Sequence, residues 1–391
     1  MKILFWVGSV AIFYTYAGYP AWLWLRSCLW PKSIHRAPFC PFVSVALVAR
    51  NEEVNLPRKL ANLQVIRYPS DQIEFIVLSD GSSDSTAEIL RQQAANDHRL
   101  RVIACPESRG KAAGLNECID SARGEIVFFT DARQQIEPDG IRLLIENFAD
   151  STVGCASGQL MLGDPSQGES NQGTGLYWRI EKQIRRWESA SGSVVGATGA
   201  IYGARRSLLV SVPPGTILDD VYLPMHVARQ GFRVVFDERA RAWDLPNLGE
   251  KREFSRKVRT LTGNYQLLQL APWIFGNGNP LRFEFFSHKF MRLIMPLALM
   301  IALVSAFFLQ GILYRAMLIA QLGIYLLALL RIAGVVKTGV FGRLADAART
   351  FVLLNAAAAT AFFNWISGRS AIWTPVKQHE AQAVLKASQT L

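Results

Sequence analysis

Cysteine is scarce in this chain of 391 residues, and the few cysteines do not form pairs. Their number is odd, and their spacing does not match the paired pattern of a zinc site. The sequence therefore predicts neither a disulfide framework nor a zinc site, and reduced thiols fit a cytoplasmic domain. The cysteines are Cys28, Cys40, Cys105, Cys118 and Cys155. The chain also lacks internal repeats and low-complexity segments, which excludes a repeat architecture.

Charge is lacking near the two ends of the chain. Residues Ile3–Leu25 carry no charged side chain, and a run of that length can cross a bilayer. The run lacks the small-residue cleavage site of a secretory signal, so we interpret it as a retained anchor. Three later runs are apolar and almost uncharged: Leu293–Leu313, Ala316–Leu330 and Phe351–Ile366. The first of these predicts a span, whereas the other two are short and leave buried or interfacial helices as alternatives.

Basic residues beside the predicted spans indicate the orientation. Three follow the first span and three precede the second: Arg26, Lys32, Arg36, Arg282, Lys289 and Arg292. The positive-inside rule then places the central region in the cytoplasm, at a bacterial inner membrane. Basic residues after position 368 would lie on the far side, a conflict that a re-entrant or surface-lying last helix removes.

The formal net charge is +11, and its basic residues are spread along the chain rather than gathered in one segment. Many of them flank the predicted spans. Attraction to anionic lipid and to phosphorylated substrates explains this distribution better than nucleic acid does. We therefore predict membrane lipids as partners and no nucleic acid.

Between the apolar ends, β-prone runs alternate with helical patterns, which predicts an α/β fold with a mostly parallel sheet and helices on both faces. The predicted strands are Phe42–Val48, Phe75–Leu78, Arg101–Ala104, Glu125–Phe129 and Arg233–Phe236. The predicted helices are Glu52–Leu63, Ser85–Ala95, Lys111–Ala122, Leu176–Ser189, Val221–Gln230 and Arg256–Leu270. Gly154–Gly175 is rich in Gly and Ser and is predicted to be a loop or short hairpin.

These patterns divide the chain into five parts. They are an N-terminal membrane helix and anchor (1–30), a cytoplasmic domain (42–270), a membrane-proximal segment (271–292), two or three C-terminal membrane helices (293–367) and a tail (368–391). The helix Leu176–Ser189 is strongly amphipathic, so packing on the domain and lying on the membrane face both fit it.

Polar motifs follow the predicted strands, where an open α/β sheet presents ligand-binding groups. Asp80 ends a strand before a Gly-containing turn, so its carboxylate suits a nucleobase edge or ribose hydroxyls. A structural Asp-Gly turn is the alternative. Glu52 poses the same choice between a nucleoside contact and a charge in the first turn of a helix. Lys111 opens a helix after Gly110, and a helix N-terminus favours a diphosphate.

Acidic and basic pairs occur further along the chain. Asp131 ends the fourth strand, a natural place for a divalent cation that bridges a diphosphate, although a single acid also fits a solvated strand end. Asp219-Asp220 precedes a helix, where the pair either complements the helix dipole or supplies a general base. Arg256 and Arg259 are three residues apart and share one helix face. They either clamp phosphates or form a basic face near the membrane.

Taken in this order, the motifs resemble those of membrane-anchored, inverting family 2 glycosyltransferases with a GT-A-type nucleotide-sugar domain. The cellulose and hyaluronan synthases are distant relatives of that kind. The resemblance covers roughly residues 42–270 and implies a Rossmann-like GT-A sheet. It also implies that Asp80 binds the nucleotide with help from Glu52 and Lys111. Asp131 then matches the first acid of the Asp-x-Asp motif, the position that ligates Mg²⁺ or Mn²⁺.

The later motifs resemble the catalytic and acceptor parts of the same family. The pair Asp219-Asp220 resembles the acidic pair that carries the base, with Asp220 at the base position. Thr198-Gly199 resembles the acceptor-site segment, and Arg256 to Thr260 resembles the Gln-x-x-Arg-Trp clamp. The predicted donor-binding set is Arg50, Glu52, Asp80, Lys111, Asp131, Arg133, Arg256 and Arg259.

Two positions depart from the family pattern. Arg133 stands where the second acid of Asp-x-Asp is expected, so that side chain cannot ligate a metal. Either the remaining metal ligands are enough to hold the cation, or the Arg133 side chain itself binds the diphosphate. Thr260 replaces the Trp expected to stack on an acceptor sugar, which favours transfer of a single sugar over processive synthesis.

The sequence therefore predicts an inverting glycosyltransferase that moves a sugar from a nucleotide-diphospho-sugar, with a UDP-sugar favoured, to a lipid-linked or polysaccharide acceptor. The resemblance implies a role in exopolysaccharide, capsule or cell-envelope glycan synthesis, alongside other proteins of that process. One alternative is transfer to polyprenyl phosphate, which needs no base at Asp220. Another is a non-catalytic membrane scaffold with a degenerate nucleotide-sugar domain.

Overall fold

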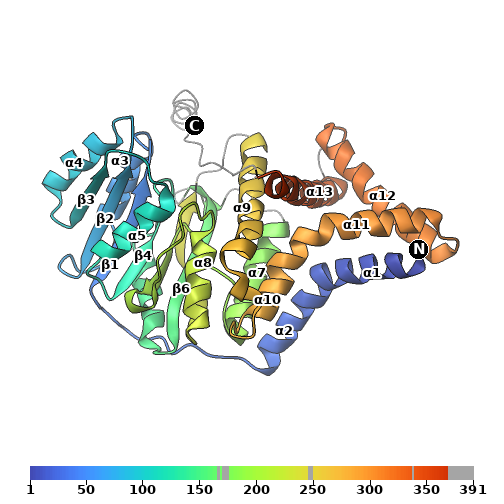
Figure 1. Ribbon diagram of the computed structural model, residues 1–391, viewed down its shortest axis with the longest axis horizontal. Helices are drawn as coiled ribbons and strands as arrows, with labels where there is room; N and C mark the ends of the chain where they lie inside the picture. The colour runs from blue at the N-terminus through green and yellow to red at the C-terminus, as the bar shows by residue number, and fades with distance from the viewer. Residues whose placement is uncertain (165–167, 170–175, 245–249, 337–338, 369–391) are drawn as a thin grey trace.

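The computed structural model describes residues 1–164, 168–169, 176–244, 250–336 and 339–368. Most of the predicted tail, from residue 369 onward, lies outside the described residues, as do 165–167 and 170–175 of the predicted loop. Figure 1 shows an α/β part at one end of the molecule and long helices that extend from its other end.

A single mixed sheet forms the centre of the α/β part. Its strands lie in the order β3-β2-β1-β4-β8-β6-β9-β5, and β7 pairs with β6. The pairs β1–β2, β1–β4, β2–β3 and β6–β9 are parallel, whereas β8 pairs antiparallel with β4 and β6. The strands are β1 Val43–Ala49, β2 Ile73–Asp80, β3 Leu100–Cys105, β4 Ile126–Phe129, β5 Gln135–Ile136, β6 Val153–Asp164, β7 Gly168–Glu169, β8 Tyr202–Arg205 and β9 Arg233–Asp244.

Helices cover both faces of the sheet, as the alternating pattern predicts. One apolar core contains residues of α5, α8 and α9, and the other contains residues of α3, α4 and α6. The bounds are α3 Leu56–Gln64, α4 Thr86–Asn96, α5 Lys111–Ser121, α6 Gly140–Ile145, α7 Leu176–Ser191, α8 Asp219–Arg229 and α9 Glu250–Leu270. Short 3-10 turns are η2 Glu146–Ala149, η3 Arg206–Leu208 and η4 Pro272–Phe275.

Two predictions of local structure differ from what the structure shows. Gly154–Gly175, predicted as a loop or short hairpin, is strand wherever the structure describes it: β6 runs from Val153 to Asp164 inside the sheet, and its end pairs antiparallel with the short β7. Its glycines serve close packing: a Cβ on Gly158 would lie 2.6 Å from the carbonyl oxygen of Ala240. The helix predicted from Glu52 begins only at Leu56, because residues before it bond to the loop before α4. The Asn51 side-chain oxygen, for example, accepts the Ser83 N–H at 2.8 Å.

The apolar ends form long helices. The first run is helical from Lys2 to Leu29, with the π-helical turn η1 Tyr14–Gly18 between α1 Lys2–Phe13 and α2 Tyr19–Leu29. The second begins with α10 Arg282–Phe285 and the π-helical turn η5 Phe286–Phe290, and continues as α11 Met291–Phe308. It is followed by α12 Ile312–Ile332. By length and composition, three helical segments of the described residues could cross a membrane: Lys2–Leu29, Arg282–Phe308 and Ile312–Ile332.

The last apolar run, Phe351–Ile366, is the C-terminal part of a longer helix, α13 Gly339–Ile366. That helix is not among the candidate spans of the described residues. Figure 1 shows α13 almost end-on while α1 and α11 lie lengthwise, so α13 crosses them steeply beside α9. The number of C-terminal spans therefore stays a prediction.

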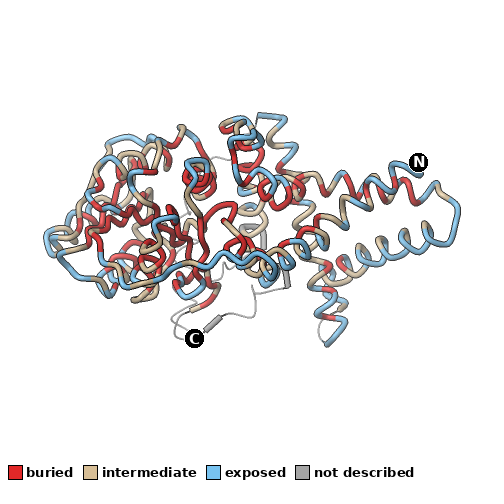
Figure 2. Tube along the Cα trace, turned by 90° about the horizontal axis from the view of Figure 1, so that it is seen from below, coloured by how far each residue is buried: buried red, intermediate tan, exposed pale blue. Residues whose placement is uncertain are grey.

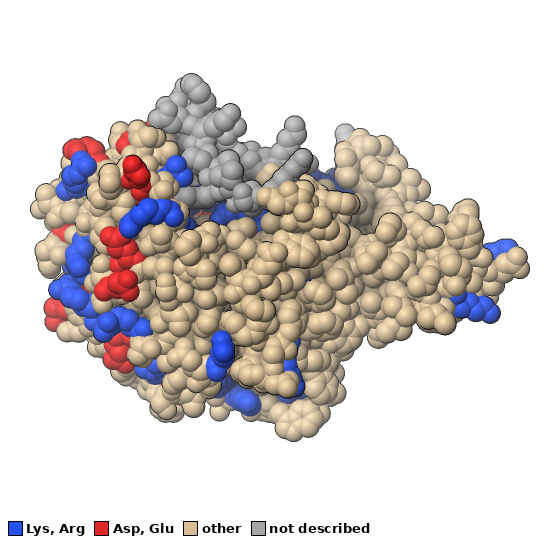
Figure 3. Space-filling view, viewed as in Figure 1, with Lys and Arg blue, Asp and Glu red and all other residues tan. Residues whose placement is uncertain are grey.

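Surface character follows the same division. Figure 2 shows α12 mostly exposed and the α/β core mostly buried. Charged side chains gather over the α/β part in Figure 3, whereas the surface of the membrane helices is largely uncharged. This contrast agrees with a chain whose helical end lies in lipid.

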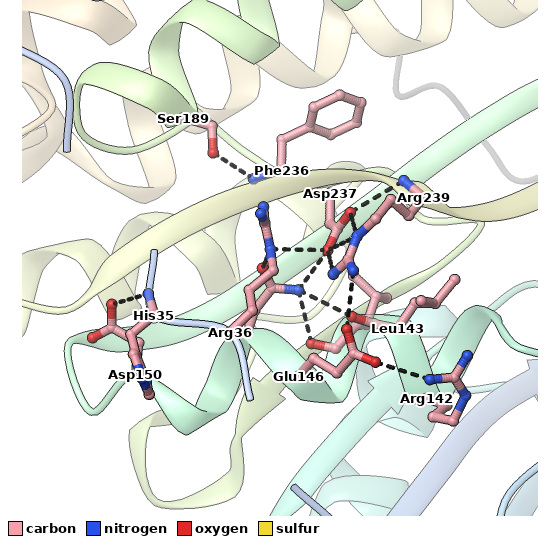
Figure 4. Close-up of polar contacts among 12 residues, drawn as sticks. His35, Arg36, Arg142, Leu143, Glu146, Asp150, Ser189, Phe236, Asp237 and Arg239 are labelled. Carbon is pink, nitrogen blue, oxygen red and sulfur yellow. Dashed lines mark hydrogen bonds and ion pairs between the residues drawn. The ribbon is translucent and has the colours of Figure 1, made fainter. Parts of the chain in front are cut away.

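The segment between α2 and β1, residues 30–42, is bound to the α/β part (Figure 4). Arg36 donates from Nε to the Asn147 side-chain oxygen at 2.9 Å and lies 3.5 Å from a carboxylate oxygen of buried Asp237. The His35 backbone N–H donates to the Asp150 carboxylate at 3.2 Å. The first membrane helix is therefore joined to the sheet by a fixed connection.

Candidate active site

The predicted donor site lies at one edge of the sheet. Strands β1, β2 and β4 are parallel, so their carboxyl ends meet at the same edge. Arg50 follows β1, Asp80 is the last residue of β2, and Asp131 follows β4 by two residues. The topology thus brings together side chains that are up to 81 positions apart, the difference between 131 and 50.

Asp80 is fully buried and holds the turn that leads into α5. Its carboxylate accepts the Ser108 hydroxyl at 2.8 Å, the Arg109 N–H at 2.7 Å and the Gly110 N–H at 2.9 Å. The next residue is Lys111, at the start of α5. Asp80 therefore fixes the position of the Lys111 backbone, in addition to any contact with a nucleoside.

Lys111 lies between two carboxylates. Its Nζ is 3.0 Å from Asp131 and 3.2 Å from Asp219. Burial alone would lower the pKa of Lys111, but the charges of Asp131 and Asp219 outweigh it and raise that pKa. The ammonium therefore stays protonated and joins the donor edge of the sheet to the start of α8.

Asp219 and Asp220 are the first two residues of α8. Burial and the charge of Asp219 raise the pKa of Asp220 to about 6, against the lowering effect of Lys111. The Asp220 carboxylate accepts the Gly199 backbone N–H at 3.1 Å. A half-buried carboxylate with a raised pKa, held by a backbone donor, suits a general base near neutral pH.

The predicted acceptor segment lies directly against this base. The Thr198 backbone N–H donates to the Ser157 hydroxyl at 3.0 Å, which ties the segment to β6. A Cβ on Gly199 would lie 3.5 Å from an oxygen of Asp131 and 3.5 Å from an oxygen of Asp220. The absent side chain thus leaves room between the carboxylate at the donor edge and the carboxylate on α8.

The residues after β1 lie beside the same edge. Burial and the charge of Asp131 raise the pKa of Glu52, whose carboxylate accepts the Asn55 side-chain amide at 2.7 Å. Arg50 is half-buried, and its Nε has no hydrogen-bond partner among the residues that the structure describes. Both side chains are therefore close to the donor edge.

Asp244, at the end of β9, is a site residue that sequence reasoning missed. It is fully buried, and its Oδ2 is 2.5 Å from Arg133 and 3.5 Å from Arg256. Burial and the charge of Arg133 lower the pKa of Arg256. The strand predicted as Arg233–Phe236 continues to Asp244. Only a prediction of the whole strand would have placed this carboxylate at a strand end, beside the other site residues.

Asp244 changes the interpretation of the position where the second acid was expected. Arg133 pairs with Asp244 and thereby lies beside Arg256 of the predicted clamp. Arg259, one helical turn after Arg256, is half-buried and has no ion-pair partner within the described ranges. Positive charge from Arg133 and Arg256 is therefore gathered at the end of β9, and guanidinium groups suit the binding of a diphosphate.

A divalent cation fits this site with few protein ligands. Among the described residues, no group of three or more His, Cys, Asp and Glu side chains is arranged to hold a metal ion. Asp131 remains accessible, however, with 41% of its side chain exposed, and glycine at position 199 leaves space beside it. Mg²⁺ is often held by one or two carboxylates together with substrate phosphates and water, so Asp131 with a diphosphate meets that pattern.

The fold and this edge of carboxylates and cations are those expected of a nucleotide-sugar glycosyltransferase. Residues 44–212 match the sequence model of the family described as Glycosyl transferase family 2. The matched segment is less than half of the chain, and candidate membrane helices lie on both sides of it.

The chain is similar to proteins described as poly-β-1,6-N-acetyl-D-glucosamine synthase. It is 25% identical over 272 residues to that of Staphylococcus aureus (strain COL), covering 68% of this chain and 64% of the relative. It is 27% identical over 235 residues to that of Staphylococcus epidermidis, covering 59% and 56%. The matched region thus spans less than two thirds of the length of these relatives.

A solved structure has the same fold over nearly the whole chain. It is the mannosyltransferase PcManGT from Pyrobaculum calidifontis, in complex with GDP-Man and Mn²⁺. The TM-score is 0.71 at 22% identity, covering 94% of this chain and 99% of that one. At this identity the likeness establishes the GT-A-like fold, including its apolar helices, and nothing about the sugar.

Proposed function

We propose that this protein is an inverting glycosyltransferase that moves a sugar from a nucleotide-diphospho-sugar to a hydroxyl group of an acceptor held at the bacterial inner membrane. One observation carries the proposal. The half-buried carboxylate of Asp220 and the donor-edge carboxylate of Asp131 face the same glycine, Gly199, while Lys111 joins Asp131 to Asp219. This arrangement supports a base at Asp220 and a diphosphate site beside Asp131, with Gly199 between them.

The donor-binding roles follow from the site. Asp80, Arg50 and Glu52 are assigned to the nucleoside, because Asp80 ends β2 and the other two lie one and three residues after the end of β1. Lys111 and three arginines are assigned to the diphosphate, because Lys111 pairs with Asp131, and Arg133 of the Asp131 loop meets Arg256 of α9 at Asp244. These arginines are Arg133, Arg256 and Arg259. A divalent cation, Mg²⁺ or Mn²⁺, bound by Asp131 and the diphosphate would neutralise charge on the leaving group.

The reaction needs one proton transfer and one displacement. Asp220 accepts the proton of the acceptor hydroxyl, and the oxygen attacks the anomeric carbon from the face opposite the diphosphate. A new glycosidic bond forms as the bond to the diphosphate oxygen breaks, so the anomeric configuration inverts. Lys111 and the arginines stabilise the negative charge that grows on the departing nucleoside diphosphate.

The donor and acceptor are proposed from the relatives and from the helices. The staphylococcal relatives are described as poly-β-1,6-N-acetyl-D-glucosamine synthases, which supports UDP-N-acetylglucosamine as the donor to test. Candidate spans on both sides of the domain support a lipid-linked or glycan acceptor in envelope or extracellular polysaccharide synthesis. The basic residues beside these spans support a cytoplasmic active site. Thr260 at the clamp supports transfer of one sugar. Other envelope-glycan proteins are expected partners.

The test measures nucleoside diphosphate release by the purified protein in detergent, with a panel of nucleotide-sugars and a lipid extract as acceptor. Release with one donor, lost on chelation of Mg²⁺ and Mn²⁺, supports the metal-assisted transferase and identifies its donor. The matched variant is Asp220→Asn, which should lose turnover and keep donor binding. Full turnover by that variant would favour a phosphate acceptor. If the unmodified protein releases no nucleoside diphosphate from any donor in the panel, the scaffold is favoured.

A further inference from the structure

Lys59 is a buried lysine beneath the donor edge that the proposed reaction does not yet use. It lies on α3, its relative exposure is 1%, and it is surrounded on the helix by the buried residues Leu56, Leu60 and Leu63. Its Nζ donates to the Thr130 hydroxyl at 2.7 Å and to the Gln134 carbonyl oxygen at 2.8 Å. These two acceptors are the ends of the loop that contains Asp131 and Arg133.

A lysine is a costly choice for this position. Taking an ammonium out of water costs several kcal/mol unless nearby charges and hydrogen bonds compensate. Lys59 donates hydrogen bonds to a hydroxyl and a carbonyl, and the favourable charge acting on it is that of Asp131. An apolar side chain would fill the same space among the leucines without this cost. The charge and its hydrogen bonds must therefore serve the loop that they hold.

The same contacts join the donor loop to the acceptor segment. The Thr130 hydroxyl accepts from Lys59 and donates to the carbonyl oxygen of Ala200 at 2.9 Å. Ala200 directly follows Gly199, the residue that separates Asp131 from Asp220. Lys59 and Thr130 thus determine how far the loop with Asp131 lies from the Gly199–Ala200 segment, whose Gly199 N–H bonds to Asp220.

We propose that Lys59 is a positioning residue of the donor site: through Thr130 and Gln134 it holds the loop so that Asp131 meets the diphosphate and its cation. The inference rests on the proposed function and extends it, because it assigns to α3 a role in donor binding. Lys59 does not touch the substrate. Loss of its hydrogen bonds therefore acts through the placement of Asp131.

Asn62 provides a matched control on the same helix face. Its side chain donates to the Ile136 carbonyl oxygen at 2.8 Å and accepts the Ile136 N–H at 2.8 Å. It therefore pins the same segment two residues beyond Gln134, away from Asp131. If α3 merely stabilises the fold, changes at Asn62 and Lys59 should have the same consequences.

The experiment measures binding of UDP with Mn²⁺ by calorimetry to the unmodified chain and to Lys59→Met, Thr130→Val and Asn62→Ala, with thermal melting of each. We expect UDP–Mn²⁺ affinity to fall about tenfold in Lys59→Met and Thr130→Val, since small misplacements of site groups cost factors of this order or more. Asn62→Ala should lower the melting temperature and leave the affinity within about twofold of the unmodified chain.

The outcomes separate the two proposals. Unchanged UDP–Mn²⁺ affinity in Thr130→Val and in folded Lys59→Met overturns the role of Lys59, and so does an equal loss in Asn62→Ala. If Lys59→Met fails to fold, Thr130→Val alone decides, because it keeps the lysine and removes only the hydroxyl. Failure of the unmodified chain to bind any nucleoside diphosphate would instead overturn the proposed function itself.

Discussion

At the scale of single residues, the candidate active site brings several charged side chains together in a partly buried position. Three carboxylates, Asp131, Asp219 and Asp220, lie around one ammonium, that of Lys111. Like charges close together cannot all ionise easily, and burial makes this harder. Among the three, burial and the charge of Asp219 raise the pKa of Asp220 to about 6.

The first residue-scale prediction concerns pH. Because the pKa of Asp220 is about 6, this base is mostly protonated below that pH and ionised above it. The rate of transfer, as kcat/KM, should therefore rise with pH and level off above pH 6 to 7. Steady-state rates of nucleoside diphosphate release across pH 5–8 test this, and a flat profile would contradict a base at Asp220.

The second residue-scale prediction uses Lys111 to move that profile. The charge of Lys111 lowers the pKa of Asp220, so removing it should raise that pKa further. Lys111→Met should shift the midpoint of the pH profile upward by about one unit, besides weakening donor binding. Lys257→Met is the control, because that lysine pairs with Glu253 on α9, and its midpoint should stay in place. A downward shift in Lys111→Met would refute the assignment.

At the scale of elements, α9 connects the predicted clamp to the last helix. Val258 and Tyr265 of α9 pack with Ala357 and Ala361 of α13, and small residues allow this close approach of helices. The ring of Tyr265 stacks on Trp365 with centroids 5.3 Å apart and planes at 17°. The position of Arg256 and Arg259 therefore depends on α13, a helix that begins at Gly339, 83 positions after Arg256 by the difference of their residue numbers.

The element-scale prediction tests this packing. Tyr265 is 5% exposed and donates its hydroxyl to the Leu293 carbonyl oxygen at 3.1 Å. Tyr265→Ala should reduce the free energy of unfolding by about 3 kcal/mol, because the ring leaves a cavity. Tyr265→Phe keeps the ring and should cost about 1 kcal/mol. Thermal melting in detergent measures both, and equal losses would show that the stack contributes nothing.

At the scale of the whole molecule, α7 joins the α/β part to the membrane helices. His288, just before α11, bonds to Glu188 at 2.8 Å and to Glu181 at 3.1 Å, both on α7. Tyr19 of α2 donates to Glu188 at 2.8 Å, and Arg292 pairs with Glu181 at 2.7 Å. Elements from both ends of the chain therefore meet on one amphipathic helix, packed between them.

The whole-molecule prediction follows from the burial of this junction. Glu188 is 0% exposed, so Glu188→Ala leaves buried partners without their carboxylate and should cost about 3–5 kcal/mol of stability. Glu238→Ala removes an exposed partner of Arg186 and should cost less than about 1 kcal/mol. Melting temperatures in detergent compare the two, and similar small changes would mean that the junction does not hold the parts together.

Much of the site could be predicted because it lies on a locally regular pattern. Parallel strands end at one edge, so polar residues after β1, β2 and β4 had to meet there, whatever the packing around them. Asp244 and Lys59 could not be found in this way. Asp244 lies at the end of β9, which continues beyond the apolar residues that predicted it. Lys59 lies on an apolar face of α3, and no residue near it in the sequence indicates its hydrogen-bond partners.

The sequence by itself determined the alternation of strands and helices, the apolar ends and the order of the motifs, because each depends on neighbours within a few residues. Only the tertiary structure decided which charges pair, since Arg133 meets Asp244 and Lys111 meets Asp219 across 111 and 108 positions, the differences of their residue numbers. It also decided that the glycine-rich segment is strand β6 and that α13 crosses the membrane helices. Such long-range contacts depend on packing, which no local pattern encodes.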